Sequence, residues 1–158
     1  MTAIRTISST RFEFTFFGLI VSLFILLATS FSPAFAVDLP DDDEQDVLIR
    51  STLATFNDAN MTGNYSVLLA KAAPQFQAQF TADKLAASFE QFRKSQLYFE
   101  EVVTADYDSY EKAKLDADGA LVLAGVFKTD DLKVTYKLRF AQTNKVWKVI
   151  GIDVDAKK

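Results

Sequence analysis

The sequence predicts an α+β domain in which N-terminal helices pack on one face of a curved antiparallel sheet. Three observations lead to this prediction. Apolar residues recur at a helical period up to about Lys94, they alternate with polar residues after it, and short turn sequences separate the alternating segments.

Residues 1–36 have the features of a secretory signal peptide. Arg5 and Arg11 give a positive start, and the uncharged run 16–28 has the length of the apolar part of such a peptide. A proline and the sequence Ala34-Phe35-Ala36 then provide a small-residue cleavage site. The alternative is an uncleaved anchor, because residues 16–36 are long enough to cross a bilayer. We expect cleavage after Ala36 and a periplasmic or secreted product without a membrane segment.

The remaining residues, 37–158, form one small acidic domain. They contain 15 basic and 20 acidic residues and carry a net charge of −5, which argues against nucleic-acid binding and against a basic membrane-surface patch. The chain has neither histidine nor cysteine, so the core has no disulfide and no site for a metal bound by either residue type. We expect no metal and no cofactor.

An acidic segment, residues 37–45, opens the domain and is interpreted as a flexible lead-in. Its carboxylates complement the positive N-terminal end of the first predicted helix. That helix extends from Glu44 to about Met61, where apolar residues recur at a helical period. Gly63 and Asn64 end it.

Shorter helices follow. A second helix is expected from Tyr65 to Lys71, and Pro74 restarts the helical segment because proline fits a first turn. Thr81 is the predicted N-cap of a third helix that ends near Lys94.

The second half of the domain is expected to be a sheet, and one pair of strands has a predicted register. A tight turn at Asp130 and Asp131 sets Phe127 opposite Val134, Gly125 opposite Tyr136 and Leu123 opposite Leu138, so every pair on that face is apolar. The glycine leaves room for the tyrosine ring. The predicted strands are Leu97–Thr104, Ser109–Leu115, Ala120–Lys128, Leu132–Ala141 and Lys145–Val154.

This order of elements, with three short motifs, resembles the NTF2-like (cystatin-like cone) superfamily. The motifs are Gly63-Asn64-Tyr65 before a short helix, Pro74-Gln75-Phe76 at a turn, and Trp147 to Ile152 in the last strand. The resemblance assigns residues 46–158 to the domain and implies a curved sheet around a long helix, often with a cone-shaped pocket. The superfamily includes dehydratases, isomerases, transport factors and domains without known activity, so it implies a fold and not an activity.

The predicted function is that of an exported, non-catalytic domain that binds a small apolar ligand or a protein partner. The alternative is an isomerase or dehydratase that works without histidine, with Asp153 as the base and Tyr136 or Tyr65 as hydrogen-bond donor. The expected pocket is lined by Phe56, Phe89, Phe92, Tyr136, Leu138 and Trp147.

The position of Asp153 depends on the register of the last hairpin. One register, with Gln142 opposite Lys145, sets Asp153 opposite Val134 on the apolar face. A three-residue loop instead puts Asp153 on the polar face, and a bulge near Gly151 satisfies both registers in part. We expect Asp153 outside the pocket or at its rim.

The strand 120–128 is apolar on both faces. Val122, Ala124 and Val126 lie on the face that does not meet the helices. A covered outer face is explained by a homodimer through the sheet or by a partner protein. The alternative is that the aliphatic parts of neighbouring lysines cover these small residues.

Overall fold

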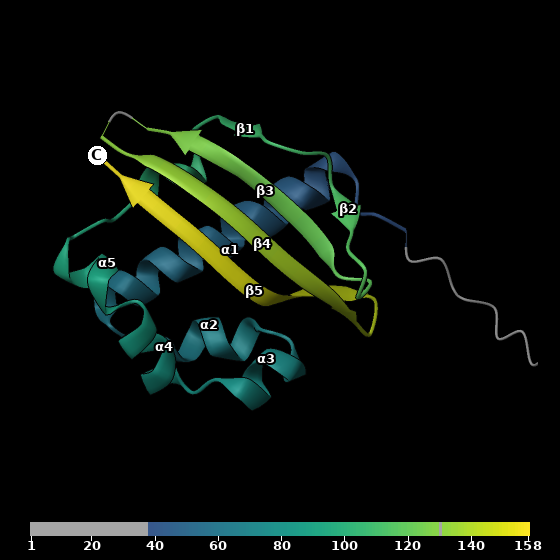
Figure 1. Ribbon diagram of the computed structural model, residues 1–158, viewed down its shortest axis with the longest axis horizontal. Coiled ribbons are helices and arrows are strands. Elements are labelled where there is room, and N and C mark those ends of the chain that lie inside the picture. Colours follow the sequence, from purple (N-terminus) through teal and green to yellow (C-terminus); the bar gives the residue numbers. More distant parts are fainter. Residues whose placement is uncertain (1–37, 130) are drawn as a thin grey trace, which may run out of the picture. The chain divides into compact units, whose positions relative to one another are not determined.

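The computed structural model describes residues 38–129 and 131–158 (Figure 1). They form an α+β unit with five α-helices, one short 3-10 helix and an antiparallel sheet of five strands. The predicted fold class is confirmed at this level, and the finer cone-shaped architecture stays a prediction. The predicted signal peptide and its cleavage site lie outside the described residues.

Helix α1 (Asp42–Thr62) is the long helix of the unit. Asp41 caps it by accepting a hydrogen bond from the Glu44 backbone N–H at 2.8 Å, and acidic residues fill its first turn. It ends at Gly63, whose φ of 71° a residue without a side chain adopts most easily. The acidic segment therefore begins the helix as expected, but residues 42–45 belong to α1 and not to a lead-in.

One stripe of α1 faces the core. Ile49, Leu53 and Phe56 recur at helical spacing and are buried in one cluster with residues of the sheet, across which α1 runs (Figure 1). Asn57 and Asn60 continue the stripe and are also buried, so their amide groups need internal partners.

Four short helices follow α1: α2 (Ser66–Lys71), α3 (Pro74–Gln79), α4 (Ala82–Ser88) and α5 (Glu90–Lys94). The predicted cap at Thr81 is confirmed, because its hydroxyl accepts a hydrogen bond from the Lys84 N–H at 3.2 Å. The third predicted helix is interrupted at Phe89, whose ψ of 18° is not helical. The Phe89 ring packs edge-on against Phe56, with 4.7 Å between the ring centroids.

The sheet consists of β1 (Tyr107–Ser109), β2 (Lys114–Leu115), β3 (Leu121–Lys128), β4 (Lys133–Thr143) and β5 (Val146–Lys157). The strand order is β1-β3-β4-β5, and β2 also pairs with β3. The predicted register between β3 and β4 is confirmed, including Gly125 opposite Tyr136. The strand expected over residues 109–115 is divided into β1, a loop and β2.

Both predicted registers of the last hairpin are wrong. The turn residues Asn144 and Lys145 have positive φ, and Thr143 pairs with Val146. A bulge shifts the register between Phe140, which pairs with Val149, and Arg139, which pairs with Gly151. The predicted bulge near Gly151 is therefore present. Asp153 consequently lies opposite Lys137 and not in either predicted pairing.

The strand expected over residues 97–104 is also wrong, because this segment contains the 3-10 helix η1 (Glu100–Val103). Side chains of α1 make hydrogen bonds to backbone groups in and next to this segment. Asn57 Oδ1 accepts the Phe99 N–H at 2.9 Å, and Arg50 donates to the carbonyls of Val102 and Ala105 at 2.7 and 2.9 Å. These bonds replace the ladder that a strand would need.

The turn at residues 116–119, before β3, is held by two residues far apart in sequence. Asp116 accepts hydrogen bonds from the N–H groups of Asp118 and Ala120, both at 3.0 Å, and from Arg139 Nε at 2.8 Å. Arg139 lies on β4, so this ion pair ties the turn to the middle of the sheet.

We expect Asp116→Asn to make the free energy of unfolding depend less steeply on pH in the acid range. Desolvation acts to raise the pKa of Asp116, but the Ala120 N–H, Arg139 and the Asp118 N–H outweigh it and lower the pKa. The stability that comes from this depressed pKa is present above the unfolded value of about 4 and is lost as pH falls through the folded pKa. Urea unfolding at several pH values measures the slope. Asp118→Asn is the control, because its side chain is 82% exposed and contacts Arg139 only at 3.1 Å. Equal slopes in the two variants would contradict the role of Asp116.

Candidate functional site

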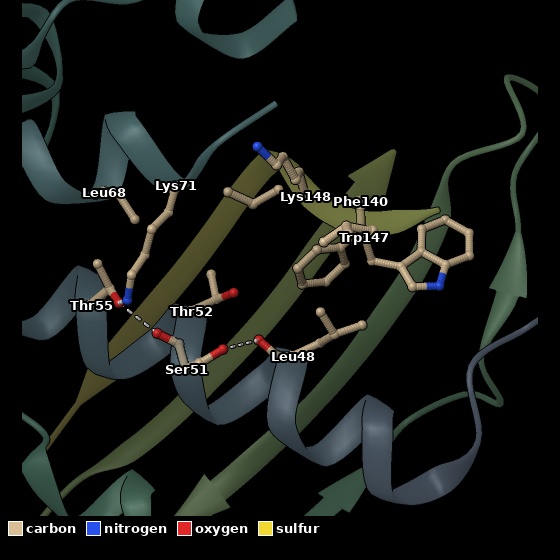
Figure 2. Close-up of a pocket in the computed structure, with 11 residues that line it drawn as sticks. Leu48, Ser51, Thr52, Thr55, Leu68, Lys71, Phe140, Trp147 and Lys148 are labelled. Carbon is tan, nitrogen blue, oxygen red and sulfur yellow. Dashed lines mark hydrogen bonds between the residues drawn. The ribbon is translucent and has the colours of Figure 1, made fainter. Parts of the chain in front are cut away.

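The candidate site is a cleft between α1, α2 and the β4–β5 hairpin, with a volume of about 350 Å³ (Figure 2). Helices α1 and α2 form one side, and the hairpin forms the other. The lining residues are Leu48, Ser51, Thr52, Thr55, Leu68, Lys71, Phe140, Val146, Trp147, Lys148 and Val149.

The α1 residues of the cleft lie next to the core stripe and not on it. The adjacent residues Ser51 and Thr52 lie three or four positions after Leu48 and before Thr55, so the four share one broad face of the helix. That face begins with an apolar residue and continues with three hydroxyl groups. The cleft is therefore amphipathic along α1.

The hairpin supplies the apolar floor. Phe140 on β4 is opposite Val149 on β5, and both side chains are buried. Trp147, two residues before Val149, lies on the same face of β5 and is 6% exposed. Leu68 of α2 closes the floor and is also buried.

A chain of hydrogen bonds crosses from α2 to α1 inside the cleft. Lys71 Nζ donates to Thr55 Oγ1 at 2.9 Å, and that hydroxyl donates to the Ser51 carbonyl at 2.7 Å (Figure 2). Thr55 is 7% exposed, so its hydroxyl depends on these partners. The Lys71 side chain is thereby directed toward α1.

The residues expected to line a cone pocket are in different places. Phe56, Leu138 and Tyr136 are at most 1% exposed, because they fill the core between α1 and the sheet. Phe89 and Phe92 pack edge-on against Phe56, with 4.7 and 5.4 Å between centroids. Among the six expected lining residues, Trp147 is the one that lines this cleft.

The functional groups of the three candidate catalytic residues do not meet, although Asp153 and Tyr136 both border a hollow on the outer face, because the Tyr136 hydroxyl is buried. Asp153 is exposed on the outer face of the sheet, opposite Lys137, and lies outside the core-facing pocket that was predicted. Tyr136 points to the inner face, where its ring packs against Tyr107 and Phe127. Tyr65 lies at the start of α2 and stacks on Phe89.

The Tyr65 hydroxyl is engaged in the fold. It donates to Asn60 Oδ1 and accepts from Arg93 at 3.2 Å, while the Asn60 amide donates to the Phe56 carbonyl at 3.1 Å. Burial raises the pKa of Tyr65, and the neighbouring Arg93 lowers it in part. This network is buried and joins α1, α2 and α5.

The Tyr136 hydroxyl has no hydrogen-bond partner among the described residues. Burial raises its pKa, as does the nearby Tyr107, while the approach of the Ser109 side chain acts in the opposite direction without reaching hydrogen-bond geometry. A neutral, fully buried and unpaired hydroxyl destabilises the folded state.

The outer face of β3 is already covered. Val122, Ala124 and Val126 are 3%, 8% and 3% exposed. Their β4 neighbours are Arg139, Lys137 and Thr135, whose aliphatic parts border them. This burial favours the alternative in which flanking side chains cover the small residues.

A second hollow, of about 380 Å³, lies on that outer face and includes Asp153. Three of its eight lining residues are acidic: Glu111, Asp153 and Asp155. Glu111 pairs with Lys114 and Asp155 pairs with Lys157. Three carboxylates in this hollow disfavour an apolar or anionic ligand, whereas the cleft on the helical side has none, so that cleft is the better ligand site.

Two further properties concern residues 38–129 and 131–158 only. No helix in this part of the chain is long and apolar enough to cross a membrane. No group of three or more acidic, histidine or cysteine side chains in it is arranged to hold a metal ion.

Sequence reasoning missed Ser51, Thr52, Thr55 and Lys71. In the sequence, Ser51 and Thr52 precede Thr55 by four and three residues within one predicted helix, and Lys71 ends the next predicted helix. A stripe of hydroxyl residues beside an apolar stripe on one helix is the signal that was available.

Comparisons with protein-family models, with curated proteins and with solved structures found no match for this chain. The cleft is therefore interpreted from its own chemistry.

Proposed function

We propose that this protein is an exported, non-catalytic domain of the NTF2-like type that binds a small, mainly apolar ligand in the α1–α2 cleft. The cleft carries the proposal. Its volume of about 350 Å³ falls within the range of roughly 300–1,000 Å³ found for small-molecule sites, and aromatic and aliphatic side chains form its floor.

Other observations support parts of this proposal. The features of residues 1–36 support export, and the order of helices before an antiparallel sheet supports the NTF2-like assignment. The separation of Asp153, Tyr136 and Tyr65 supports a non-catalytic role, since a base and its donor must reach one substrate. A homodimer or a partner protein on the outer face has less support, because the small residues there are buried.

Trp147 makes the proposal testable, because it is the only tryptophan of the chain and lies in the cleft. We expect N-phenyl-naphthylamine, a neutral apolar probe, to bind saturably and to receive excitation energy from Trp147. Thr52→Phe fills the cleft from α1 and is expected to abolish the transfer.

Val47→Phe is the matched control, because Val47 is on the same helix, is 62% exposed and does not line the cleft. This variant is expected to bind the probe as the unaltered protein does. Absence of binding, or binding that Thr52→Phe leaves unchanged, contradicts the proposed site. Far-ultraviolet circular dichroism of each variant establishes that it is folded.

A further inference from the structure

The charged residues that line the cleft are all positive. Its lining includes three hydroxyl residues and the two lysines Lys71 and Lys148, but no acidic residue. The chain as a whole has a net charge of −4, so a cleft without carboxylates differs from the rest of the protein. Such a cleft favours an anion over a cation of the same size.

The Lys71 ammonium has more hydrogen-bond donors than it uses among the described residues. An ammonium group has three N–H donors, and the hydrogen bond that Lys71 makes among the described residues is to Thr55 Oγ1. Lys71 takes part in none of the ion pairs formed by residues 38–129 and 131–158. Asp58 shares an adjoining hollow with Lys71, yet no ion pair joins the two.

Thr55 fixes the direction of this charge. Its hydroxyl proton is committed to the Ser51 carbonyl, so the hydroxyl oxygen faces Lys71 as an acceptor. The bond holds the lysine stem along the cleft and the ammonium beside α1 (Figure 2). Thr55 is thus a positioning residue for Lys71.

Lys148 differs from Lys71. It alternates along β5 with Trp147 and Val149, which are buried on the cleft face, so its side chain leaves the strand on the other side. Lys84 is the matched control of the same residue type, because it is exposed on α4 and does not line the cleft.

We infer that the ligand is an amphipathic monocarboxylate, with its carboxylate bound to Lys71 and its apolar body on Phe140, Trp147 and Val149. This inference rests on the function proposed above and adds the chemical class of the ligand. A single anchored ammonium with free donors suits one carboxylate, and charge-assisted hydrogen bonds of this type are roughly twice as strong as neutral ones. The apolar floor excludes a ligand that is charged along its whole length.

The test compares octanoate with octanol, which have the same apolar chain and different head groups. Titrations followed by Trp147 fluorescence are expected to show octanoate binding at least about tenfold more tightly than octanol. Lys71→Met is expected to remove this preference by weakening the binding of octanoate more than that of octanol. Lys84→Met is expected to keep the preference.

Each result has a distinct meaning. Equal binding of both compounds to the unaltered protein overturns the carboxylate assignment and leaves the apolar site intact. A preference that survives Lys71→Met overturns the role of Lys71. Displacement of octanoate by inorganic phosphate but not by acetate overturns the carboxylate class in favour of a phosphate ester. If neither octanol nor octanoate binds, the proposed function itself fails.

Discussion

Gly125→Ala is expected to destabilise the domain by about 2–3 kcal/mol. A Cβ at this position would lie 2.5 Å from the Asp108 carbonyl oxygen and 2.6 Å from the Tyr136 hydroxyl oxygen. The carbonyl belongs to β1, and the Tyr136 ring is held by Tyr107 and Phe127, so neither neighbour moves easily. Urea unfolding followed by Trp147 fluorescence measures the change.

Gly151→Ala is the control for this prediction. Gly151 is also within a strand, but its added Cβ would lie 3.4 Å from its nearest neighbour, Arg139 Cβ, which is an ordinary contact. We expect a change within about 0.5 kcal/mol. The double variant Gly125→Ala with Tyr136→Phe is expected to recover part of the loss, because it removes the hydroxyl clash and leaves those with the Asp108 carbonyl and with the ring carbon Cζ at 2.9 Å. Equal effects of the two glycine variants would contradict the close packing of β1, β3 and β4.

The second prediction is that removing a tyrosine hydroxyl has opposite effects at two buried sites. Tyr65→Phe is expected to lower the free energy of unfolding by about 1–2 kcal/mol, because Asn60 Oδ1 loses its donor and Arg93 loses an acceptor. Tyr136→Phe is expected to raise it by about 1 kcal/mol, because its hydroxyl is buried without a partner.

Both tyrosines are 1% exposed, so the two substitutions remove the same hydroxyl group from side chains of equal solvent exposure. Both have a raised pKa and are neutral at pH 7, which means that the comparison reports hydrogen bonding and not charge. Urea unfolding at pH 7 gives the two values. A loss of stability in Tyr136→Phe equal to that in Tyr65→Phe would show that the Tyr136 hydroxyl has a partner in solution.

Local patterns were sufficient for much of the fold. The helical period and the acidic start predicted α1 to within a few residues, and Thr81 was predicted as a cap from its residue type. Strict alternation in the strand after residue 131 predicted its pairing with β3, because a shift by one residue would turn its apolar face outward. Each of these signals depends on neighbours in sequence or on one strand partner.

The two main errors, in residues 97–104 and in the last hairpin, have different physical causes. Residues 97–104 have strand-like composition, but side chains of α1, distant in sequence, bind the Phe99 N–H and the Val102 carbonyl, and the segment forms η1 instead. The last hairpin combines a two-residue turn with a bulge, and no apolar pairing rule includes the extra residue.

The candidate site could also be predicted from the sequence only in part. The amino-acid sequence was enough to identify an apolar, aromatic-rich core and to predict the class of the fold, but not the register that sets the position of Asp153. Tertiary packing decided that Phe56, Tyr136 and Leu138 fill this core. It also decided that the hollow lies beside the core, where Lys71 and Thr55 meet across sixteen residues of chain. The physical reason is that a hydrophobic pattern specifies which residues are buried, whereas the space left between packed elements depends on how helices and strands from distant parts of the chain approach one another.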